Sequence, residues 1–358
     1  PLPLKKSELR YTARNNREYN MTIIKYDVIV IGAGHAGIEA ALAATRIGCK
    51  TAICTLSKSS IGLMPCNPSI GGPAKGQIVG EIDALGGEMG RCADKTHLQL
   101  KVLNRSRGPA VQCLRSQNDK YDYQNTMKEK LLSTKNLTVI ETEVTHIQIE
   151  NNQIEGIVTT TGTFFTNNLV ITTGTFLKSK LHVGLNSTEG GRYHEPSTNF
   201  LSDSLKQHLK LGRLKTGTPP RLDKNSIDFS NLILQPGDPE FLSFSFKTPY
   251  NTNYKAQLPC HLSQTTKETH KVILNNLDRS PLFTKVIQGT GPRYCPSIED
   301  KVMRFKDKDH HHIFLEPESK TTNEIYPQGL NTSLPADIQN SLLKTMPGLK
   351  DVIVLKWG

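Results

Sequence analysis

The first strong pattern of hydrophobic and polar positions lies between residues 26 and 48. Residues 28–31 are all apolar and β-branched, as is typical of a buried strand in a parallel sheet. An alanine-rich helical pattern follows residues 32–37, and the next apolar stretch, residues 50–56, predicts a second strand. Strand, turn, helix and strand in this order indicate a doubly wound α/β domain.

The turn between the first strand and the helix has the sequence GAGHAG. In such a GxGxxG turn, Gly32 allows the tight turn, Gly34 lets the backbone approach a pyrophosphate, and Gly37 lets the helix pack closely on the strand. The helix N-terminus adds free N–H groups and a positive dipole end. We therefore expect a dinucleotide here. The alternative, a glycine-rich turn without a ligand, is disfavoured because strand, turn and helix are all intact.

The second strand departs from the usual dinucleotide fingerprint at its carboxyl end. An Asp or Glu about 20 residues after the turn normally binds the ribose, but this strand ends in Thr55, Leu56 and Ser57. The hydroxyls of Thr55 and Ser57 are the remaining candidates for that hydrogen bond, which would be weaker. The fingerprint is therefore incomplete at the position that selects the dinucleotide.

Beyond residue 116 the pattern predicts one helix, at 117–133, and then a series of short strands. The strands are expected at residues 137–141, 143–149, 154–160, 163–166 and 169–173. A three-stranded antiparallel meander followed by a strand that ends at Gly174 is typical of flavoproteins with two dinucleotide sites, whereas a nicotinamide dehydrogenase would more often continue as an unbroken βαβαβ unit. The expected fold is α/β: a Rossmann-like FAD-binding domain of the glutathione-reductase type with an antiparallel β-meander and an inserted α+β subdomain.

Changes in composition divide the chain. Residues 1–21 are expected to be a disordered N-terminal extension, and residues 22–220 the first part of the FAD-binding domain, with an active-site loop insertion at about 57–115 that is rich in Gly, Pro and Ser. Many prolines and few helix signals indicate an inserted nicotinamide or substrate subdomain at 221–290. Residues 291–358 are expected to return to the FAD-binding domain.

Charge and cysteine content restrict the class of protein. The 358 residues carry a formal net charge of +11, which suits a polyanionic partner such as RNA. Seven cysteines without a CxxC pair or zinc spacing fit a reducing compartment, and we expect a cytoplasmic protein, or a mitochondrial one in a eukaryote. The run His310, His311 and His312 predicts a solvated turn and no metal site, since three consecutive side chains cannot all face one ion.

The peptide PCNPSIGGPAKG places Cys66 and Asn67 between two prolines and before several glycines. Such a stretch can hold its backbone close to a ligand, and we count Asn67 among the cofactor-binding candidates. The alternative is a surface loop with many turns.

Several long peptides of this chain resemble one family. They are IGAGHAGIEAA, CNPSIGGPAKG, EIDALGGEMG, LNRSRGPAV, GTFL, GRLKTGTPPR, THKVILNNLDRSP, GPRYCPSIEDKVMRF, HIFLEPES, IYPQGLNTSLP and PGLK. They run from about residue 26 to the end of the chain, in the order of the MnmG (GidA) family of tRNA-modifying flavoproteins. GRLKTGTPPR and GPRYCPSIEDK are long and rare enough to be specific.

The resemblance implies a reaction, cofactors and partners. Members of this family bind FAD, use NADH, and act with the GTPase MnmE, with which a heterotetramer is expected, on tRNA. They add an aminomethyl or carboxymethylaminomethyl group to the 5-carbon of the wobble uridine, with methylenetetrahydrofolate as the methylene donor. A homodimer without membrane attachment is also expected.

The resemblance further implies which residues contact the cofactors. For FAD these are Gly32, Ala33, Gly34, His35, Ala36, Gly37, Val144 and Thr198. For the nicotinamide they are Gly291, Pro292, Arg293, Tyr294, Cys295, Pro296, Ser297, Ile298, Glu299, Asp300, Lys301, Val302, Met303, Arg304 and Phe305.

Cys295 and Cys66 match the two family cysteines implicated in activity. A thiolate that adds to the 6-carbon of uracil makes its 5-carbon nucleophilic, and nearby positive charge favours the thiolate. Arg293, Lys301 and Arg304 surround Cys295 in sequence, so we rank Cys295 as the catalytic thiol and Cys66 as assisting near the flavin. The carboxylates beside Lys301 are equally consistent with a general base and with an ordinary helix start.

The chain stops at Gly358, whereas the family continues into a further FAD-contacting segment and a helical domain that docks MnmE and helps to hold tRNA. We therefore expect a fragment whose activity alone is in question. Two other functions stay open: a TrmFO-like folate-dependent tRNA uracil methyltransferase, and a non-catalytic fragment that binds RNA or a GTPase.

Overall fold

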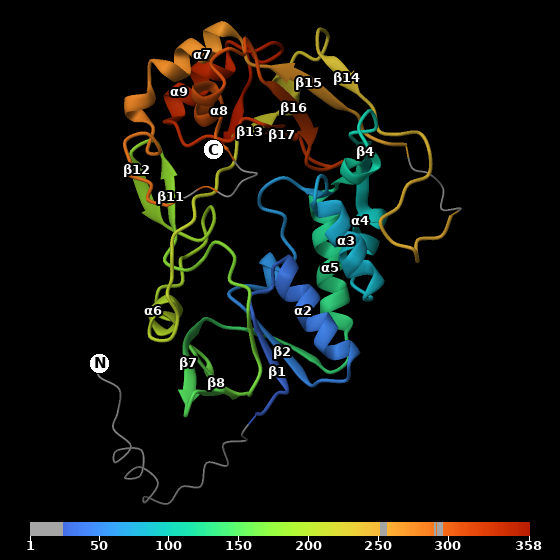
Figure 1. The fold of residues 1–358 in the computed structure, drawn as a ribbon, viewed down its shortest axis with the longest axis vertical. Coiled ribbons are helices and arrows are strands. Elements are labelled where there is room, and N and C mark those ends of the chain that lie inside the picture. The colour runs from blue at the N-terminus through green and yellow to red at the C-terminus, as the bar shows by residue number, and fades with distance from the viewer. Residues whose placement is uncertain (1–23, 251–255, 290, 292–295) are drawn as a thin grey trace, which may run out of the picture.

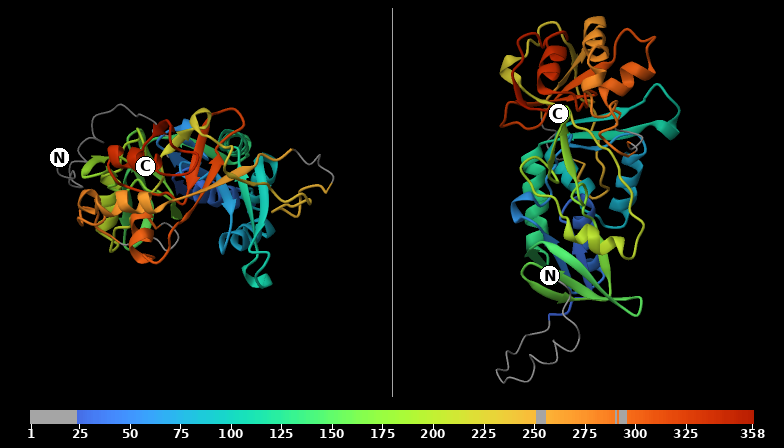
Figure 2. Two further views of the ribbon diagram at one scale, coloured as in Figure 1. Left: turned by 90° about the horizontal axis from the view of Figure 1, so that it is seen from above. Right: turned by 90° about the vertical axis from the view of Figure 1, so that its left-hand side faces the viewer.

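The computed structural model describes residues 24–250, 256–289, 291 and 296–358. These residues form two units that are stacked along the long axis of the molecule (Figure 1). The first unit holds the parallel sheet and the second holds a larger antiparallel sheet, and the side view shows the same stacking (Figure 2).

The first unit is built on a four-stranded parallel sheet in the order β10-β1-β2-β6. Its strands are β1 (Val28–Ile31), β2 (Thr51–Thr55), β6 (Leu137–Glu141) and β10 (Leu169–Ile171). Helices α2 (His35–Arg46) and α5 (Lys120–Ser133) cover one face. Every residue of β2 is buried, as expected for a central parallel strand between two layers. The expected α/β FAD-binding fold is confirmed.

The antiparallel meander covers the other face of this sheet. It consists of β7 (Val144–Glu150), β8 (Gln153–Thr159) and β9 (Gly162–Phe165), with α6 (Phe200–Lys206) beside it. Because side chains alternate along a strand, Val30 and Ile53 face the helices whereas Ile29 and Ala52 pack against the meander. The predicted meander is thus the third layer of the first unit.

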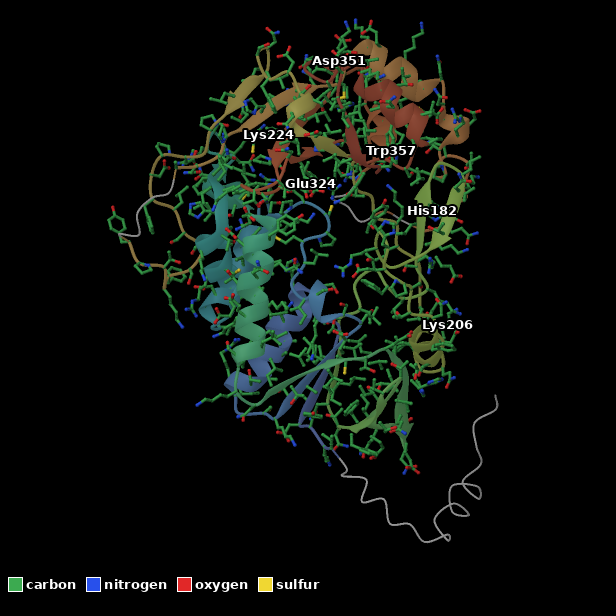
Figure 3. The ribbon with its side chains drawn as sticks, turned by 180° about the vertical axis from the view of Figure 1, so that it is seen from behind. His182, Lys206, Lys224, Glu324, Asp351 and Trp357 are labelled. Atoms are coloured by element: carbon green, nitrogen blue, oxygen red, sulfur yellow. The ribbon has the colours of Figure 1, made fainter. Side chains whose placement is uncertain are left out.

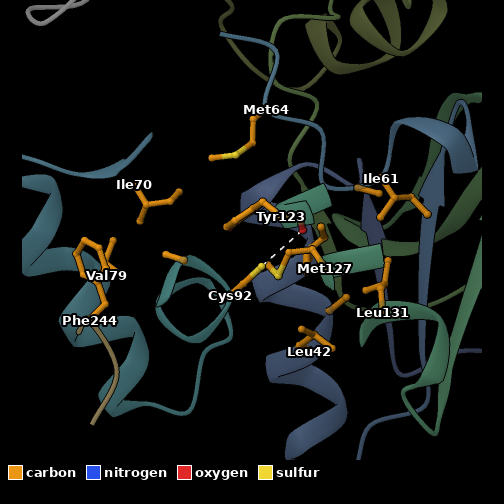
Figure 4. Packing of buried hydrophobic residues seen from close by; sticks show 14 of the residues in the cluster. Leu42, Ile61, Met64, Ile70, Val79, Cys92, Tyr123, Met127, Leu131 and Phe244 are labelled. Carbon is orange, nitrogen blue, oxygen red and sulfur yellow. Dashed lines mark hydrogen bonds between the residues drawn. The ribbon is translucent and has the colours of Figure 1, made fainter. Parts of the chain in front are cut away.

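The segment expected as a loop at 57–115 is instead a small folded layer. It contains η1 (Lys58–Ser60), β3 (Ser69–Gly71), α3 (Lys75–Ala84), α4 (Met89–Thr96), β4 (His97–Leu103), η2 (Pro109–Val111) and the start of β5 (Cys113–Asn118). Strands β3, β5 and β4 form an antiparallel sheet. Ile70 and Val79 of this layer pack with Phe244 in the same core as Leu42 and Met127 (Figure 4).

The helix expected from residue 117 starts later, at Lys120, because Asp119 ends the strand and caps the helix. Its carboxylate accepts hydrogen bonds from the N–H groups of Tyr121 and Asp122, which are among the donors that a helix N-terminus leaves without partners. Gln117 lies in β5.

The second unit is a six-stranded antiparallel sheet in the order β14-β15-β16-β17-β13-β18. Its elements are β13 (Arg221–Asp223), η3 (Lys224–Ser226), β14 (Ile233–Gln235), β15 (Cys260–Gln264), α7 (Lys267–Leu274), η4 (Leu277–Arg279), α8 (Ile298–Arg304), β16 (His312–Pro317), β17 (Glu324–Gln328), α9 (Ala336–Leu343) and β18 (Val354–Lys356). The hairpin β11 (Lys180–Val183) and β12 (Asn186–Glu189) lies in the segment that connects the two units.

Strand pairing differs from the expected return to the first unit after residue 290. Strands β16, β17 and β18 extend the second sheet rather than the parallel one. Ile313, Leu315 and Ile325 complete an apolar core with helices α7, α8 and α9, which the parallel sheet, already covered on both faces, could not provide.

None of the helices in the described part of the chain has the length and apolar character that a membrane crossing requires.

Candidate functional site

The GAGHAG turn lies at the carboxyl end of β1, between β2 and β10. The chain leaves β1 toward β2 on one side and later returns to β10 on the other, so this turn is the topological switch point at which open α/β sheets bind ligands. Gly32 has φ +100° and donates its N–H to Cys54 O at 2.8 Å, while Thr172 N–H bonds Ile31 O at 2.8 Å.

The three glycines of the turn have different roles. A Cβ at Gly37 would lie 1.8 Å from the carbonyl oxygen of Gly32, and one at Gly32 would lie 2.4 Å from that of Thr172. Gly34 is exposed, and a Cβ there would have no neighbour within 4 Å. Packing within the protein therefore requires glycine at positions 32 and 37. At Gly34 the protein leaves room for a side chain, so only a bound ligand would require glycine there.

The N-terminus of α2 is open to an anion. Gly34 is its N-cap, no side chain caps the helix, and its first turn contains no acidic residue. Together with the open space at Gly34, this arrangement fits a pyrophosphate. The predicted strand, turn and helix are confirmed, and the contacts of Gly32, Ala33, Gly34, His35, Ala36 and Gly37 with FAD remain a prediction.

His35 lies beside the turn as a neutral imidazole. Its ring packs edge-on against Tyr123 with 5.6 Å between centroids, and burial, assisted by the charge of Arg192, lowers the pKa of His35. Its Nδ1 has no hydrogen-bond partner among the described residues. Sequence reasoning missed Arg192, which pairs with Glu195 and stacks on Phe176.

At the carboxyl end of β2, where a ribose would be expected, the hydroxyls of Thr55 and Ser57 both form hydrogen bonds with residues close in the sequence. Thr55 Oγ1 donates to Ser57 O at 3.1 Å, and Ser57 Oγ accepts from Ser59 N at 3.2 Å. The neighbouring strand in the sheet supplies an acid here: Glu141 pairs with Thr55 and accepts from Lys58 N at 2.7 Å. No pattern within β2 could have indicated it.

The two other FAD candidates lie in segments that pack near the meander. Val144 opens β7 and is buried in the meander core, so its side chain packs against protein. Thr198 donates its N–H and its hydroxyl to Phe176 O, in the segment that follows β10. Thr198 therefore lies close to the switch point, and both contacts with FAD remain predictions.

The loop that carries Cys66 connects the dinucleotide turn with the second unit. Its Gly62 N–H bonds Ala33 O at 3.0 Å, and Met64 packs beside Tyr123 (Figure 4). Four residues span at most about 14 Å, so Cys66 lies within that distance of Gly62. Cys66 is an exposed residue, and its sulfur lies 3.1 Å from the hydroxyl oxygen of Tyr326 in β17.

Asn67 is held by the second unit. Its amide Nδ2 donates to Glu316 Oε2 at 2.8 Å and to Gln328 Oε1 at 3.1 Å, and Arg115 forms an ion pair with the same Glu316 at 2.8 Å. Its Oδ1 is buried and has no partner within the described residues. Asn67 thus anchors the loop and leaves one acceptor unused.

Behind this loop the two units meet through charged groups. Glu318 pairs with Lys120 at 2.8 Å and with Arg221 at 2.6 Å. Glu324, seen in Figure 3 on the side of the second sheet that faces the first unit, pairs with Lys356 at 2.5 Å. Sequence reasoning did not predict this cluster.

Only part of the predicted nicotinamide segment can be placed. Cys295, with Pro292, Arg293 and Tyr294, lies outside the described residues. In the rest, Ser297 caps α8, Glu299 accepts from Thr332 Oγ1 at 2.9 Å, and Lys301 Nζ donates to Gly329 O at 2.8 Å.

The other described residues of that segment divide by exposure. Ile298 and Val302 are in the second core, Pro296, Asp300 and Met303 are half-buried, and Gly291, Arg304 and Phe305 are exposed. The buried members hold the helix in place, and contact of this segment with a nicotinamide remains a prediction.

Three further cysteines are poor nucleophiles. Burial raises the pKa of Cys54, Cys92 and Cys260 to about 12 in each case. Since the thiolate is the reactive form, exposed Cys66 is far better suited to chemistry than these three.

A family model described as "Glucose inhibited division protein A", or GIDA, matches residues 27–358. This chain belongs to the GIDA family. It is 52% identical over 335 residues to the tRNA uridine 5-carboxymethylaminomethyl modification enzyme MnmG of Syntrophomonas wolfei, covering 93% of this chain and 53% of that protein. The MnmG of Bacillus subtilis is 51% identical over 338 residues, with the same coverage.

Among solved structures, Aquifex aeolicus GidA in its form I crystal superposes on this GIDA-family chain with a TM-score of 0.88 at 48% identity, covering 93% of this chain and 57% of that one. The form II crystal gives a TM-score of 0.86. The chain thus spans about half the length of the curated relatives that it matches.

Proposed function

We propose that this chain is the FAD-binding, thiol-bearing part of an enzyme that modifies the wobble uridine of tRNA at its 5-carbon, adding an aminomethyl or carboxymethylaminomethyl group. The observation that carries the proposal is the joining of the GAGHAG turn to the Cys66 loop through the Gly62–Ala33 hydrogen bond. The names of relatives about half identical over 93% of the chain support the substrate.

FAD would lie with its pyrophosphate at the N-terminus of α2, where Gly34 leaves the backbone accessible. Bound there, FAD would supply hydride chemistry with NADH. His35, held neutral by burial, would add no positive charge to this end of the helix, so the backbone N–H groups and the helix dipole would bind the phosphates.

For the nucleobase chemistry, a thiolate would add to the 6-carbon of uracil and make the 5-carbon nucleophilic toward a methylene donor such as methylenetetrahydrofolate. Loss of the proton from the 5-carbon would then expel the folate nitrogen and leave an exocyclic methylene, to which an amine, ammonium or glycine, would add. Expulsion of the thiolate would restore the uracil ring and complete the substitution. Cys295 remains the first candidate for this thiol, and Cys66 would assist near the flavin.

The partners belong to the same proposal. A net charge of +11 supports a tRNA substrate, and the resemblance supports action with the GTPase MnmE, a homodimer and a cytoplasmic or, in a eukaryote, mitochondrial location. The relatives' names favour this function over a TrmFO-like methyltransferase and over a non-catalytic RNA- or GTPase-binding fragment.

The test compares flavin retention in two valine variants. We expect Gly34→Val to lose FAD after gel filtration, measured by flavin absorbance, because its side chain would fill the space needed by the pyrophosphate. Gly108→Val is the matched control, since Gly108 is also an exposed N-cap with extended backbone and no neighbour within 4 Å of a Cβ.

Equal FAD retention by the two variants would overturn the cofactor site. With FAD bound, the chain is then incubated with MnmE, GTP, NADH, the methylene donor, ammonium or glycine, and unmodified tRNA, and the nucleosides are analysed by mass spectrometry. Unchanged wobble uridine in the presence of retained flavin would favour the non-catalytic fragment.

A further inference from the structure

The contact between Cys66 and Tyr326 joins an exposed nucleophile to a buried phenol. The two residues are 260 positions apart in the sequence, and Tyr326 is only 1% exposed. Tyr326 lies opposite Glu316 in the β16–β17 pair, and the guanidinium of Arg221 lies 4.6 Å from the centre of its ring. The phenol is thus fixed by the second unit, while the sulfur belongs to a loop of the first.

We propose that Tyr326 and Arg221 are positioning residues for Cys66: the Tyr326 hydroxyl donates a hydrogen bond to the thiolate, and Arg221 fixes the loop that carries it. The catalytic meaning of this arrangement rests on the proposed function, because that function is what requires a reactive Cys66.

The direction of the hydrogen bond follows from the protonation of its partners. Burial, and after it the neighbouring Cys66, raise the pKa of Tyr326, so its hydroxyl keeps its proton well above neutral pH. A thiolate has no proton, so it can only accept and the hydroxyl must donate. A hydrogen bond to the charged form of a group favours that form.

Arg221 is placed to fix the loop with all its donors. A guanidinium has five N–H donors in a rigid plane, and here each finds an acceptor. The acceptors are Glu318 Oε1 at 2.6 Å, Thr218 Oγ1 at 2.9 Å, Pro219 O at 2.6 Å, Pro65 O at 3.0 Å and Cys66 O at 3.4 Å. Two of the five belong to the Cys66 loop, so Arg221 ties its backbone to β13.

The charged groups behind the loop form a connected network. Its described ion pairs contain the cations Arg115, Lys120, Arg221 and Lys356 and the carboxylates Glu316, Glu318 and Glu324. The buried carboxylate of Asp119, which accepts from Lys320 N at 2.8 Å, lies in the same junction, so four cations face four carboxylates and the network holds the loop in place.

The test measures how fast Cys66 reacts with iodoacetamide between pH 6 and 10, in the whole chain, with peptide mass spectrometry to separate Cys66 from the other cysteines. A hydrogen bond to a charged group is worth about 1.5–3 kcal/mol. We therefore expect Tyr326→Phe to react about 10- to 150-fold more slowly at pH 7. At high pH, where the thiol is fully ionised in both proteins, the rates should converge.

Tyr123→Phe is the matched control, because Tyr123 is equally buried and its hydroxyl has no partner among the described residues. Its Cys66 rate should equal that of the unmodified chain at every pH. A purely structural Tyr326 would instead give the same pH dependence in Tyr326→Phe as in the control, and that result would overturn the proposal.

The role of Arg221 is tested separately by Arg221→Lys, which keeps the charge but loses the five-donor plane. We expect faster amide hydrogen exchange in a peptide covering residues 62–68 for Arg221→Lys and unchanged exchange for Tyr326→Phe; unchanged exchange in Arg221→Lys would remove Arg221 from the proposal. None of these assays needs flavin, tRNA or MnmE, so their failure is distinguishable from failure of the proposed function.

Discussion

Gly37 and Gly34 should respond to alanine in opposite ways in the absence of any ligand. At Gly37 the new Cβ would lie 1.8 Å from Gly32 O and 2.7 Å from Thr172 Oγ1, and real Cβ contacts are not shorter than 3.0 Å. The Gly32 carbonyl would thus have to move by about 1.2 Å. That oxygen also accepts the Thr172 hydroxyl at 3.0 Å, so the movement would cost this hydrogen bond as well.

The expected destabilisation of Gly37→Ala follows from these contacts. Overpacking of this kind costs about 1–3 kcal/mol, and the lost hydrogen bond adds about 1 kcal/mol, which together predict a loss of about 3 kcal/mol. Gly34→Ala should stay within about 0.5 kcal/mol of the unmodified chain, because its Cβ would meet no neighbour and its φ of −78° suits any residue.

The assay is urea unfolding of the apo chain and both variants, followed by circular dichroism. Equal midpoints for Gly37→Ala and the unmodified chain would refute the packing role of Gly37. A large loss in Gly34→Ala without FAD would refute the inference that only a ligand requires glycine there.

Two further predictions concern buried and titrating charges. Glu318→Gln should destabilise the chain by about 3–5 kcal/mol in urea unfolding, because it leaves Arg221 without its buried counter-charge and Lys120 with only Glu324, 3.8 Å away. Asp337→Asn, in an exposed ion pair, is the control and should have little effect; equal midpoints for Glu318→Gln and this control would contradict the reasoning. Burial, with neighbouring cations, lowers the pKa of His311 to about 4, so the unfolded chain binds more protons than the folded one between about pH 6.5 and 4, and stability should fall as the pH decreases through that window. His311→Asn should make urea midpoints at pH 7 and 4.5 differ less, and an unchanged difference would contradict the assigned pKa.

The parallel sheet and its turn could be predicted because their signals are local. Residues 28–31 form an apolar β-branched run, and the glycines that follow are spaced by the geometry of one turn. The packing contacts of Gly32 and Gly37 in the structure explain that spacing directly. Where a single strand and helix define a feature, the sequence pattern was sufficient.

The layer at 57–115 was misinterpreted because its elements are short. Strand β3 has three residues and is bounded by Pro68 and Gly72, so glycine and proline dominate the pattern although strands lie between them. Its pairing with β5 spans more than 40 residues. Short strands that depend on distant partners give little periodicity of their own.

The environment of Cys66 could not be predicted because it depends on partners that are even more distant in the sequence. Its contacts with Tyr326 and Arg221 cross 260 and 155 positions, and no spacing rule connects such residues. One local signal was present: in EIYPQ, Glu324, Tyr326 and Gln328 alternate with Ile325 and Pro327. This alternation predicts a strand with one polar face, but it does not say what that face contacts.

That polar face explains why the site needs both units. The first unit supplies the dinucleotide turn and, through Gly62, the loop that ends at Cys66. The second supplies the hydroxyl, the guanidinium and the carboxylates that hold this loop. Because the apolar core of each unit is separate, the polar contacts of Cys66 and Asn67 lie outside both cores. A change at this junction can therefore alter the position of the thiol without unfolding either unit, which makes the junction the place where movement of one unit relative to the other would change the reactivity of Cys66.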